Sequence, residues 1–483
     1  MKKILYLASE ALPFASSGGL GDVMGALPKA MVREQPDSDV RVMIPLYSTV
    51  ADAYRSKMVM EKQFTVELAW RKQYCAIFSY KKDGVIYYFI DNEYYFKRPS
   101  LYGEFDDGER FAYFCHAALC AMAELDFFPD IMHCNDWQTA PAVIYLKTLY
   151  CRDPRYAGIK TVFSIHNILF QGIYDFALLG DIFALPDAAA GIVEYSGLIN
   201  LMKGAIVCSD LVGTVSPTYA KEICTAEYSN GLDHMIRMYQ GKVFGILNGI
   251  DTDYYNPATD EELVRNYTYR SIGRKKENKL GLCKMLGLEE RADRPLISVI
   301  SRLTDQKGLD LIMAVADRIM ERDVTFVILG CGDSRYEAYF ASLEQRYPGK
   351  VKTLLTYNKP LSKKIYAASD LFLMPSKTEP CGLSQMIASR YGAVPIVRET
   401  GGLYDSIKPY YPFADGTFEG NGFTFANYNA EDMLYVINSA LDLYGNKEQF
   451  NKLAQRAAKT DFSWNASAKS YKEIYEKLLQ PTH

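Results

Sequence analysis

Short apolar runs, each the length of one buried β-strand, alternate along the chain with stretches whose apolar residues recur at helical spacing. In the first half these runs predict strands at Lys3–Ala8, Val40–Pro45, Ile131–Asn135, Lys160–Ile165, Leu211–Val215 and Val243–Leu247. The dipeptide Asp83-Gly84 predicts a hairpin within Tyr74–Ile90, and helices are expected over Arg110–Leu125 and from Thr139.

The same alternation returns after a polar, mixed segment at Asp251–Arg294. Strands are predicted at Leu296–Ser301, Thr325–Gly330, Lys352–Thr356, Leu371–Met374 and Val394–Arg398, with helices at Lys307–Met320 and Asn465–Leu479. Strand–helix alternation on both sides of a linker predicts two doubly wound, mostly parallel α/β domains. We place them at 1–248 and 249–464, with the helix 465–483 packing back on the first. A ligand cleft between the domains is the default expectation.

Composition narrows the class of protein. A chain of 483 residues is too long for one core, and 49% hydrophobic with 23% charged residues is ordinary for a soluble globular protein. The formal net charge is −4 and the basic residues form no long block, so nothing indicates nucleic acid.

Cysteine usage and the N-terminus bear on the compartment. None of the ten cysteines forms a C-x-x-C pair or has metal-ligand spacing, which indicates reduced thiols in the cytoplasm. The apolar run after Met1 is too short for a signal peptide, and no run approaches the ~20 apolar residues of a membrane helix. We therefore expect no membrane partner and no metal.

The stretch Met374–Met386 is where the chemistry concentrates. Leu371–Met374 reads as a strand, Pro380 stops the chain, and a helix is expected from Gly382 to about Tyr391. Glu379 then lies on a strand-to-helix turn, and the N–H groups of Cys381, Gly382 and Leu383 would be free for a phosphate or a sugar oxygen. The alternative is an ordinary Pro-Gly loop with a solvated Glu379.

Six other predicted strand ends carry polar or glycine-rich residues. Arg302 and Lys307 could reach one diphosphate, although they could also be a surface pair. Asp136-Trp137 could bind a sugar, or could be a capping Asp beside a core Trp. His166-Asn167 also ends a predicted strand, where the histidine could be a structural residue. Glycine turns follow at Gly18-Gly19-Leu20-Gly21, which does not match G-x-G-x-x-G, at Gly330-Cys331-Gly332 and at Thr400-Gly401-Gly402. Their common position at strand ends favours one ligand site.

These motifs resemble the glycogen and starch synthase family (glycosyltransferase family GT5) over essentially the whole chain. The matching signatures are Ser9-Glu10 with Gly18-Gly19-Leu20-Gly21-Asp22-Val23, His133-x-Asn135-Asp136-Trp137-Gln138, Ser164-Ile165-His166-Asn167, Leu247-Asn248-Gly249, Ser301-Arg302-Leu303 with Gln306-Lys307-Gly308, Glu379-Pro380-Cys381-Gly382-Leu383 and Thr400-Gly401-Gly402-Leu403. The resemblance implies a GT-B fold, two Rossmann-like domains facing a central cleft. It also implies retaining transfer of glucose from ADP-glucose to the non-reducing end of an α-1,4-glucan, as in glycogen biosynthesis, with no cofactor.

The resemblance also implies residue roles. Catalytic residues would be Asp136, His166, Arg302, Lys307 and Glu379. Donor-binding residues would be Ser16, Gly18, Gly19, Asp22, Asn248, Gly330, Tyr357, Cys381, Gly382, Leu383 and Thr400, with Tyr357 stacking on the adenine. Tyr95, Trp137 and Asn167 would face the glucan.

One departure concerns Ser16. The family normally carries a lysine there, which touches the donor diphosphate, whereas a serine brings no charge. This departure favours one alternative, a catalytically weak glucan-binding homologue. Two others stay open: UDP-glucose as donor, and an α-glucan phosphorylase on a similar two-domain fold, which would need pyridoxal phosphate.

Overall fold

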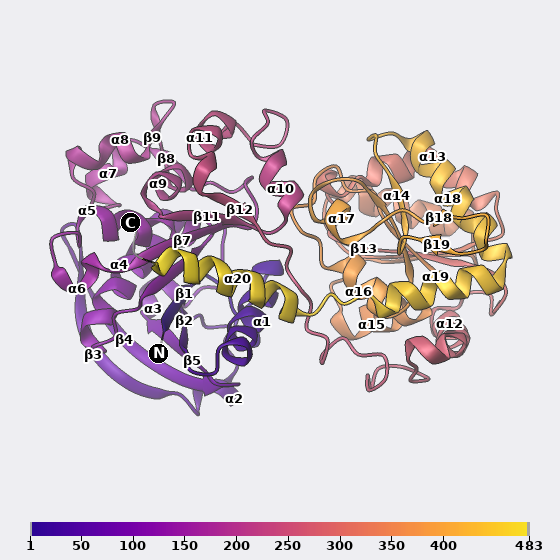
Figure 1. Cartoon of the computed structure of the whole chain (residues 1–483), viewed down its shortest axis with the longest axis horizontal. Coiled ribbons are helices and arrows are strands. Elements are labelled where there is room, and N and C mark those ends of the chain that lie inside the picture. Colours follow the sequence, from indigo (N-terminus) through magenta and orange to yellow (C-terminus); the bar gives the residue numbers. More distant parts are fainter. Residues whose placement is uncertain (1, 481–483) are drawn as a thin grey trace. The chain divides into compact units, whose positions relative to one another are not determined.

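The computed structural model describes residues 2–480, which form two compact α/β units. The first unit runs to Gly249 and takes in the C-terminal segment from Trp464, and the second is Ile250–Ser463. Figure 1 shows a largely parallel sheet flanked by helices in each unit, as the alternating pattern predicted.

The first unit is built on a nine-stranded sheet in the order β12-β11-β7-β6-β1-β2-β5-β4-β3. All neighbours are parallel except β4, which is antiparallel to both β5 and β3. The strands are β1 (Lys3–Leu7), β2 (Asp39–Pro45), β3 (Val59–Leu68), β4 (Arg71–Lys82), β5 (Val85–Asp91), β6 (Ile131–Asn135), β7 (Lys160–Ile165), β11 (Leu211–Thr214) and β12 (Val243–Gly245). A small sheet holds β8 (Ile173–Asp175), β9 (Glu194–Tyr195) and β10 (Leu198–Asn200).

Helices cover this sheet and connect its parallel strands. They are α1 (Gly19–Glu34), α2 (Asp52–Arg55), α3 (Glu93–Phe96), α4 (Asp107–Glu124), α5 (Ala140–Thr148), α6 (Pro154–Ala157), α7 (Leu178–Asp181), α8 (Ala190–Val193), α9 (Leu201–Cys208), α10 (Pro217–Glu222), α11 (Asp233–Met238) and α20 (Trp464–Leu479). Short 3₁₀ turns lie at η1 (Trp137–Thr139), η2 (Asp187–Ala189) and η3 (Gln240–Lys242). The C-terminal helix α20 lies against α1 (Figure 1).

The second unit has a six-stranded parallel sheet in the order β15-β14-β13-β16-β17-β20. Its strands are β13 (Leu296–Ile300), β14 (Thr325–Leu329), β15 (Val351–Leu354), β16 (Leu371–Met374), β17 (Val394–Arg398) and β20 (Phe423–Phe425), beside a hairpin of β18 (Tyr411–Pro412) and β19 (Phe418–Glu419). Its helices are α12 (Lys275–Leu286), α13 (Leu309–Met320), α14 (Ser334–Arg346), α15 (Lys359–Ala368), α16 (Ser384–Arg390), α17 (Gly401–Ser406), α18 (Ala430–Gly445) and α19 (Lys447–Lys459), with 3₁₀ turns η4 (Tyr269–Arg274) and η5 (Asp305–Lys307).

Among the elements that the sequence pattern did not predict, two have a clear physical reason. The pattern did not predict β3, because this edge strand exposes most of its side chains and forms no apolar run. It also missed α12, because the inward face of that helix carries Lys275, Asn278 and Lys279 beside its apolar residues. The ammonium of Lys275 is nevertheless satisfied, since it donates to the backbone oxygens of Ala367 and Tyr391.

The pairing of strands decides which polar residues become neighbours. Asn135, the last residue of β6, pairs with Ser164 of β7, so Asp136 and His166 leave the sheet side by side. In the second unit β13 pairs with β16, which brings the segments after both strands to the same edge. Each unit therefore carries one cluster of polar side chains at the carboxyl edge of its sheet.

Candidate functional site

An ion pair lies at the carboxyl edge of the sheet in the second unit. Lys307 Nζ is 2.6 Å from Glu379 Oε2, and Ser376 Oγ donates to the same oxygen at 3.0 Å. Both members of the pair are largely buried. Because Lys307 lies in the turn η5 after β13 and Glu379 follows β16, pairing of these strands creates the contact.

Arg302 lies two residues after the end of β13 and is exposed. Within the described part of the chain its guanidinium group has no hydrogen-bond or ion-pair partner. A guanidinium at the same edge of the sheet as the Lys307 ammonium can bind a diphosphate, because its planar fork matches the phosphate oxygens. The helix expected from Lys307 begins instead at Leu309, since Gly308 adopts a left-handed conformation with φ 68°.

The loop after Glu379 is held by its neighbours. Gln385 Nε2 donates to the backbone oxygens of Cys381 (3.1 Å) and Gly382 (2.9 Å). The N–H of Gly402 donates to the carbonyl oxygens of Glu379 and Pro380, both at 3.1 Å. A Cβ at Gly401 would overlap the carbonyl oxygen of Glu379, so only glycine permits this contact.

One expectation about these loops needs correction. Helix α16 begins at Ser384, so the N–H groups of Cys381, Gly382 and Leu383 precede the helix instead of opening it. Cys381 is also mostly buried. The turn at Thr400 supports the Glu379 loop, as its Gly402 N–H is occupied, and the Thr400 side chain is fully buried.

The remaining expected donor residues of the second unit occupy different surroundings. Gly330 directly follows β14, at a point where a Cβ would overlap the carbonyl oxygen of Ser301, so it permits close packing of two strand ends. Tyr357 follows β15 and is 78% exposed, which leaves its ring free to stack on a planar group.

In the first unit, the corner formed by Asp136 and His166 has a constrained backbone. Asp136 has φ 59° and ψ 177°, a region that only glycine adopts readily. The strain is held by hydrogen bonds: Asp136 N–H donates to the backbone oxygen of Ser164 at 2.9 Å, and His166 N–H donates to Asp136 Oδ1 at 2.8 Å. Backbone strain of this kind clusters at functional sites.

Burial shifts the pKa values of both Asp136 and His166. The Asp136 carboxyl lies deep in the protein, although the residue keeps some accessible surface. Burial raises its pKa to about 7, while hydrogen bonds from the N–H groups of His166 and Asn167 lower the pKa by a smaller amount. Burial lowers the pKa of His166 to about 4. The His166 ring is therefore neutral at pH 7, and its Nε2 lies 2.9 Å from Asn135 Oδ1.

The glycine-rich turn before α1 is organised by a carboxylate that the sequence-based assignment left without a role. The buried Glu10 accepts hydrogen bonds from Ser17 N–H (2.6 Å), Ser17 Oγ (2.8 Å), Gly18 N–H (3.1 Å) and Tyr102 Oη (2.7 Å). The expectation of free N–H groups is therefore wrong for Gly18. Glu10 belongs to a quoted motif, but its partners could not be deduced from the sequence.

Other residues of this turn fit the expected site better. A Cβ at Gly18 or Gly19 would meet no atom within 4 Å, so both glycines border open space. Ser16 packs over Gly21, and Asp22 lies in the first turn of α1.

Asn248 is buried and its Oδ1 has no hydrogen-bond partner among residues 2–480, so it remains available to a ligand donor.

Two of the residues expected to face a glucan do not reach the surface. Tyr95 is fully buried and its hydroxyl donates to Glu109 Oε1 at 2.6 Å, while its neighbour Tyr94 is exposed. Trp137 is a core residue whose ring packs edge-on against Phe111. Asn167 is partly exposed and its Oδ1 accepts the N–H of Leu169, closing its own turn.

Two searches of the described residues gave no site. Residues 2–480 contain no group of three or more His, Cys, Asp or Glu side chains placed to hold a metal ion. No helix in that range is both long and apolar enough to cross a membrane.

The chain is similar in sequence to known proteins. Residues 3–238 match the starch synthase catalytic domain, and residues 287–460 match the glycosyl transferases group 1. Glycogen synthases from Geobacillus thermodenitrificans and Clostridium perfringens are both 48% identical to this chain over 480 residues, covering 99% of it and 98% of each relative.

Two solved structures are similar in fold. The catalytic domain of starch synthase IV from Arabidopsis thaliana, bound to ADP and acarbose, superposes with a TM-score of 0.90 at 36% identity and 99% coverage of both chains. A sucrose-phosphate synthase from Thermosynechococcus elongatus has a TM-score of 0.62 at 15% identity with 99% coverage of both chains, which shows a shared fold alone. The chain therefore belongs to the glycogen and starch synthase family of glycosyltransferases and has the GT-B fold.

Proposed function

We propose that this chain transfers glucose from ADP-glucose to the non-reducing end of an α-1,4-glucan, with retention at the anomeric carbon. The observation that carries the proposal is the Lys307–Glu379 pair at one edge of the second unit's sheet. Arg302 lies at the same edge, and its guanidinium has no partner among residues 2–480. The similar starch synthase IV structure is bound to ADP and acarbose, a nucleotide and a sugar, which supports both substrate classes.

The leaving group of this reaction is a nucleoside diphosphate, on which negative charge grows in the transition state. Arg302 and Lys307 are proposed to stabilise that charge, because preorganised cations in a partly buried site act strongly on it. With two cations in this role, the proposal includes no metal ion and no organic cofactor.

Carboxylates are proposed to act on the sugar. Glu379 would orient the hydroxyl groups of the donor glucose or stabilise positive charge on its ring. Asp136 and His166, in the first unit, would act near the reacting centre, where the neutral His166 ring can donate or accept one hydrogen bond. Donor contacts are proposed for Ser16, Gly18, Gly19, Asn248 and Tyr357.

The test is the initial rate of glucose incorporation into a glycogen primer with ADP-glucose and with UDP-glucose. We expect the higher kcat/KM with ADP-glucose. A higher kcat/KM with UDP-glucose would reassign the donor. No incorporation from either donor would leave a glucan-binding homologue, and a visible absorbance band from pyridoxal phosphate would indicate a phosphorylase.

A further inference from the structure

Three buried polar side chains connect the C-terminal helix α20 to the carboxyl ends of β6 and β7. His133 Nδ1 lies 2.6 Å from Tyr475 Oη, and His133 Nε2 lies 2.7 Å from Ser164 Oγ. His133 and Tyr475 are fully buried and Ser164 is 2% exposed. A buried polar group is costly unless it is hydrogen-bonded, and both nitrogens of this ring have a partner. The orientation of the imidazole is therefore fixed.

The chain of hydrogen bonds has a direction. Burial lowers the pKa of His133 to about 3, so its ring is neutral at pH 7. A neutral imidazole has one donor and one acceptor nitrogen, so one hydroxyl accepts from the ring and the other donates to it. Tyr475 Oη also lies 3.1 Å from Tyr6 Oη on β1, which anchors its end of the chain.

The other end of the chain is the strained corner described above. The side chain of Ser164 contacts His133, while its backbone oxygen accepts the N–H of Asp136, the residue with φ 59°. Asp136 in turn accepts the N–H of His166. Ser164 therefore lies between the C-terminal helix and both polar residues of this corner.

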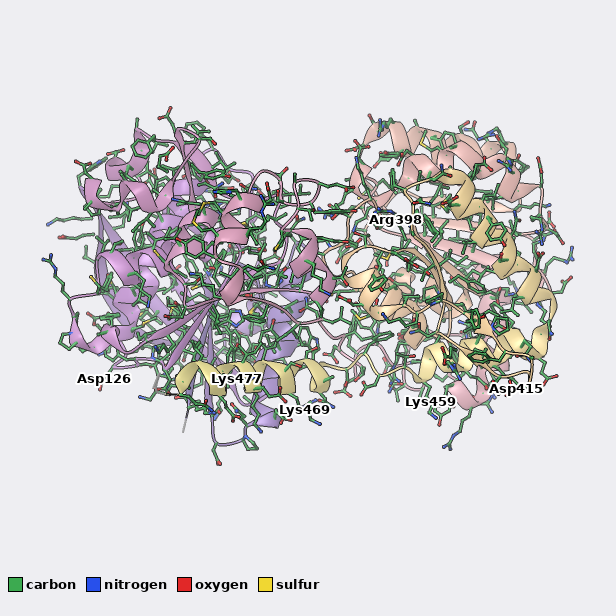
Figure 2. All side chains as sticks on the ribbon, turned by 45° about the horizontal axis from the view of Figure 1, so that its top comes forward. Asp126, Arg398, Asp415, Lys459, Lys469 and Lys477 are labelled. Carbon is green, nitrogen blue, oxygen red and sulfur yellow. The ribbon has the colours of Figure 1, made fainter. Side chains whose placement is uncertain are left out.

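The rest of α20 contributes less specific contacts. Its outer side carries exposed lysines, among them Lys469 and Lys477 (Figure 2), while Tyr471 and Tyr475 point inward. The ion pairs Lys472–Glu34 and Lys2–Glu476 are partly exposed, and such pairs stabilise little. Tyr475 is the residue of this helix whose hydroxyl lies within hydrogen-bonding distance of the His133 imidazole. Tyr471 contacts the same imidazole with its ring, at 5.8 Å between the centroids.

We propose that Tyr475, His133 and Ser164 are positioning residues that hold Asp136 and His166 in the geometry needed for glucosyl transfer. The C-terminal helix is then a part of the catalytic corner and not only a cover for the sheet. The catalytic meaning of this inference rests on the proposed function, whereas the structural coupling to His166 does not.

The kinetic test uses variants that remove one hydroxyl and keep the packing. Tyr475→Phe and Ser164→Ala should each lower kcat about tenfold, while the donor KM stays within about twofold, because small misplacement of catalytic groups costs rate more than binding. The kcat of the double variant should fall no further than that of the more affected single variant, since both substitutions break the same series of hydrogen bonds. Tyr471→Phe, four residues earlier on the same helix, is the matched control and should keep wild-type kcat.

A second readout does not depend on activity. The protein has 5 histidines, so nitrogen chemical shifts of the rings can be assigned by NMR. Tyr475→Phe and Ser164→Ala should shift the ring signals of His166 as well as those of His133, and Tyr471→Phe should leave His166 unchanged.

Each outcome decides the matter. If the NMR shifts change only for His133 and kcat stays within twofold of wild type, the proposal is overturned, and the Tyr475–His133–Ser164 hydrogen bonds only stabilise the core. Additive losses in the double variant overturn it as well. If wild-type protein transfers glucose from no donor, the proposed function fails, and the His166 signals still test the coupling. If Tyr475→Phe does not fold, Ser164→Ala carries both readouts.

Discussion

Lys307 Nζ and Glu379 Oε2 lie 2.6 Å apart, with the hydroxyl of Ser376 donating to the same carboxylate oxygen. The cation that we assign to the donor diphosphate is therefore already paired with a carboxylate in the chain. A diphosphate entering this site competes with Glu379 for the ammonium group. The ion pair thus couples donor affinity to the charge of Glu379.

Glu379→Gln should strengthen ADP binding and weaken catalysis. Removing the carboxylate charge frees Lys307 for the diphosphate and removes a like charge, so the Kd for ADP should fall several-fold by calorimetry. Turnover should fall by about 10²-fold, because the carboxylate no longer acts on the donor sugar. Ser376→Ala, which keeps the charge, is the control. Unchanged or weaker ADP binding in Glu379→Gln would contradict the competition.

Arg302→Ala should reduce turnover by about 10²–10³, equivalent to about 2–4 kcal/mol of transition-state stabilisation. Arg302→Lys should restore only part of the rate, because the planar fork is lost. Arg318→Ala is a suitable control, as it removes an exposed guanidinium on α13 whose partner is Glu431. A loss of less than about threefold in Arg302→Ala would refute the diphosphate assignment.

Ser16→Lys should lower the donor KM several-fold, since one added cation near a phosphate contributes roughly 1 kcal/mol in a partly screened site. The gain should shrink as salt is added. Ser16→Met, similar in length and uncharged, controls for the bulk of the new side chain over Gly21. A donor KM that does not move at any ionic strength would show that Ser16 does not face the diphosphate.

The rate should depend on the ionisation of Asp136. Burial raises the pKa of this carboxyl to about 7, so the charged form is lost as the pH falls through that value. If the carboxylate is required, log kcat should fall by about one per pH unit below pH 7. The pKa of His166, lowered to about 4, adds no inflection above pH 5. A residual rate of Asp136→Asn with the same inflection would assign the titration to another group.

Acid should destabilise the first unit through His133. Its folded-state pKa is lowered to about 3, so the unfolded chain takes up this proton more readily below pH 6.5. Above pH 6.5 this histidine is neutral in both states and does not change the free energy of unfolding. As the pH falls from 6.5 toward 3, the free energy of unfolding decreases, and the loss is about 2 kcal/mol at pH 5.

Tryptophan fluorescence during urea denaturation measures this effect, because all 3 tryptophans, Trp70, Trp137 and Trp464, belong to the first unit. His133→Gln cannot titrate, so its free energy of unfolding should change less between pH 7 and pH 5 than that of wild type. Equal changes in both proteins would rule out His133 as the source.

The alternation of strands and helices, and the polar residues at the strand ends, follow from the amino-acid sequence alone. Ile131–Asn135, Lys160–Ile165, Leu371–Met374 and Val394–Arg398 are strands with the predicted bounds. These runs are short, apolar and bounded by turn residues, which is local information that does not depend on the rest of the fold. The motifs after them were likewise sufficient to indicate the family.

Which side chains are buried, and which partners they have, depends on the tertiary fold. Tyr95 and Trp137 are polar-tipped aromatic residues that suit a sugar surface equally well on sequence grounds, yet packing against distant segments buries both. Glu10 reaches Ser17 across seven positions, Lys307 reaches Glu379 across 72, and His133 reaches Tyr475 across 342. Hydrophobic periodicity records which face of an element is apolar, whereas burial and hydrogen bonding depend on what the fold brings against that face.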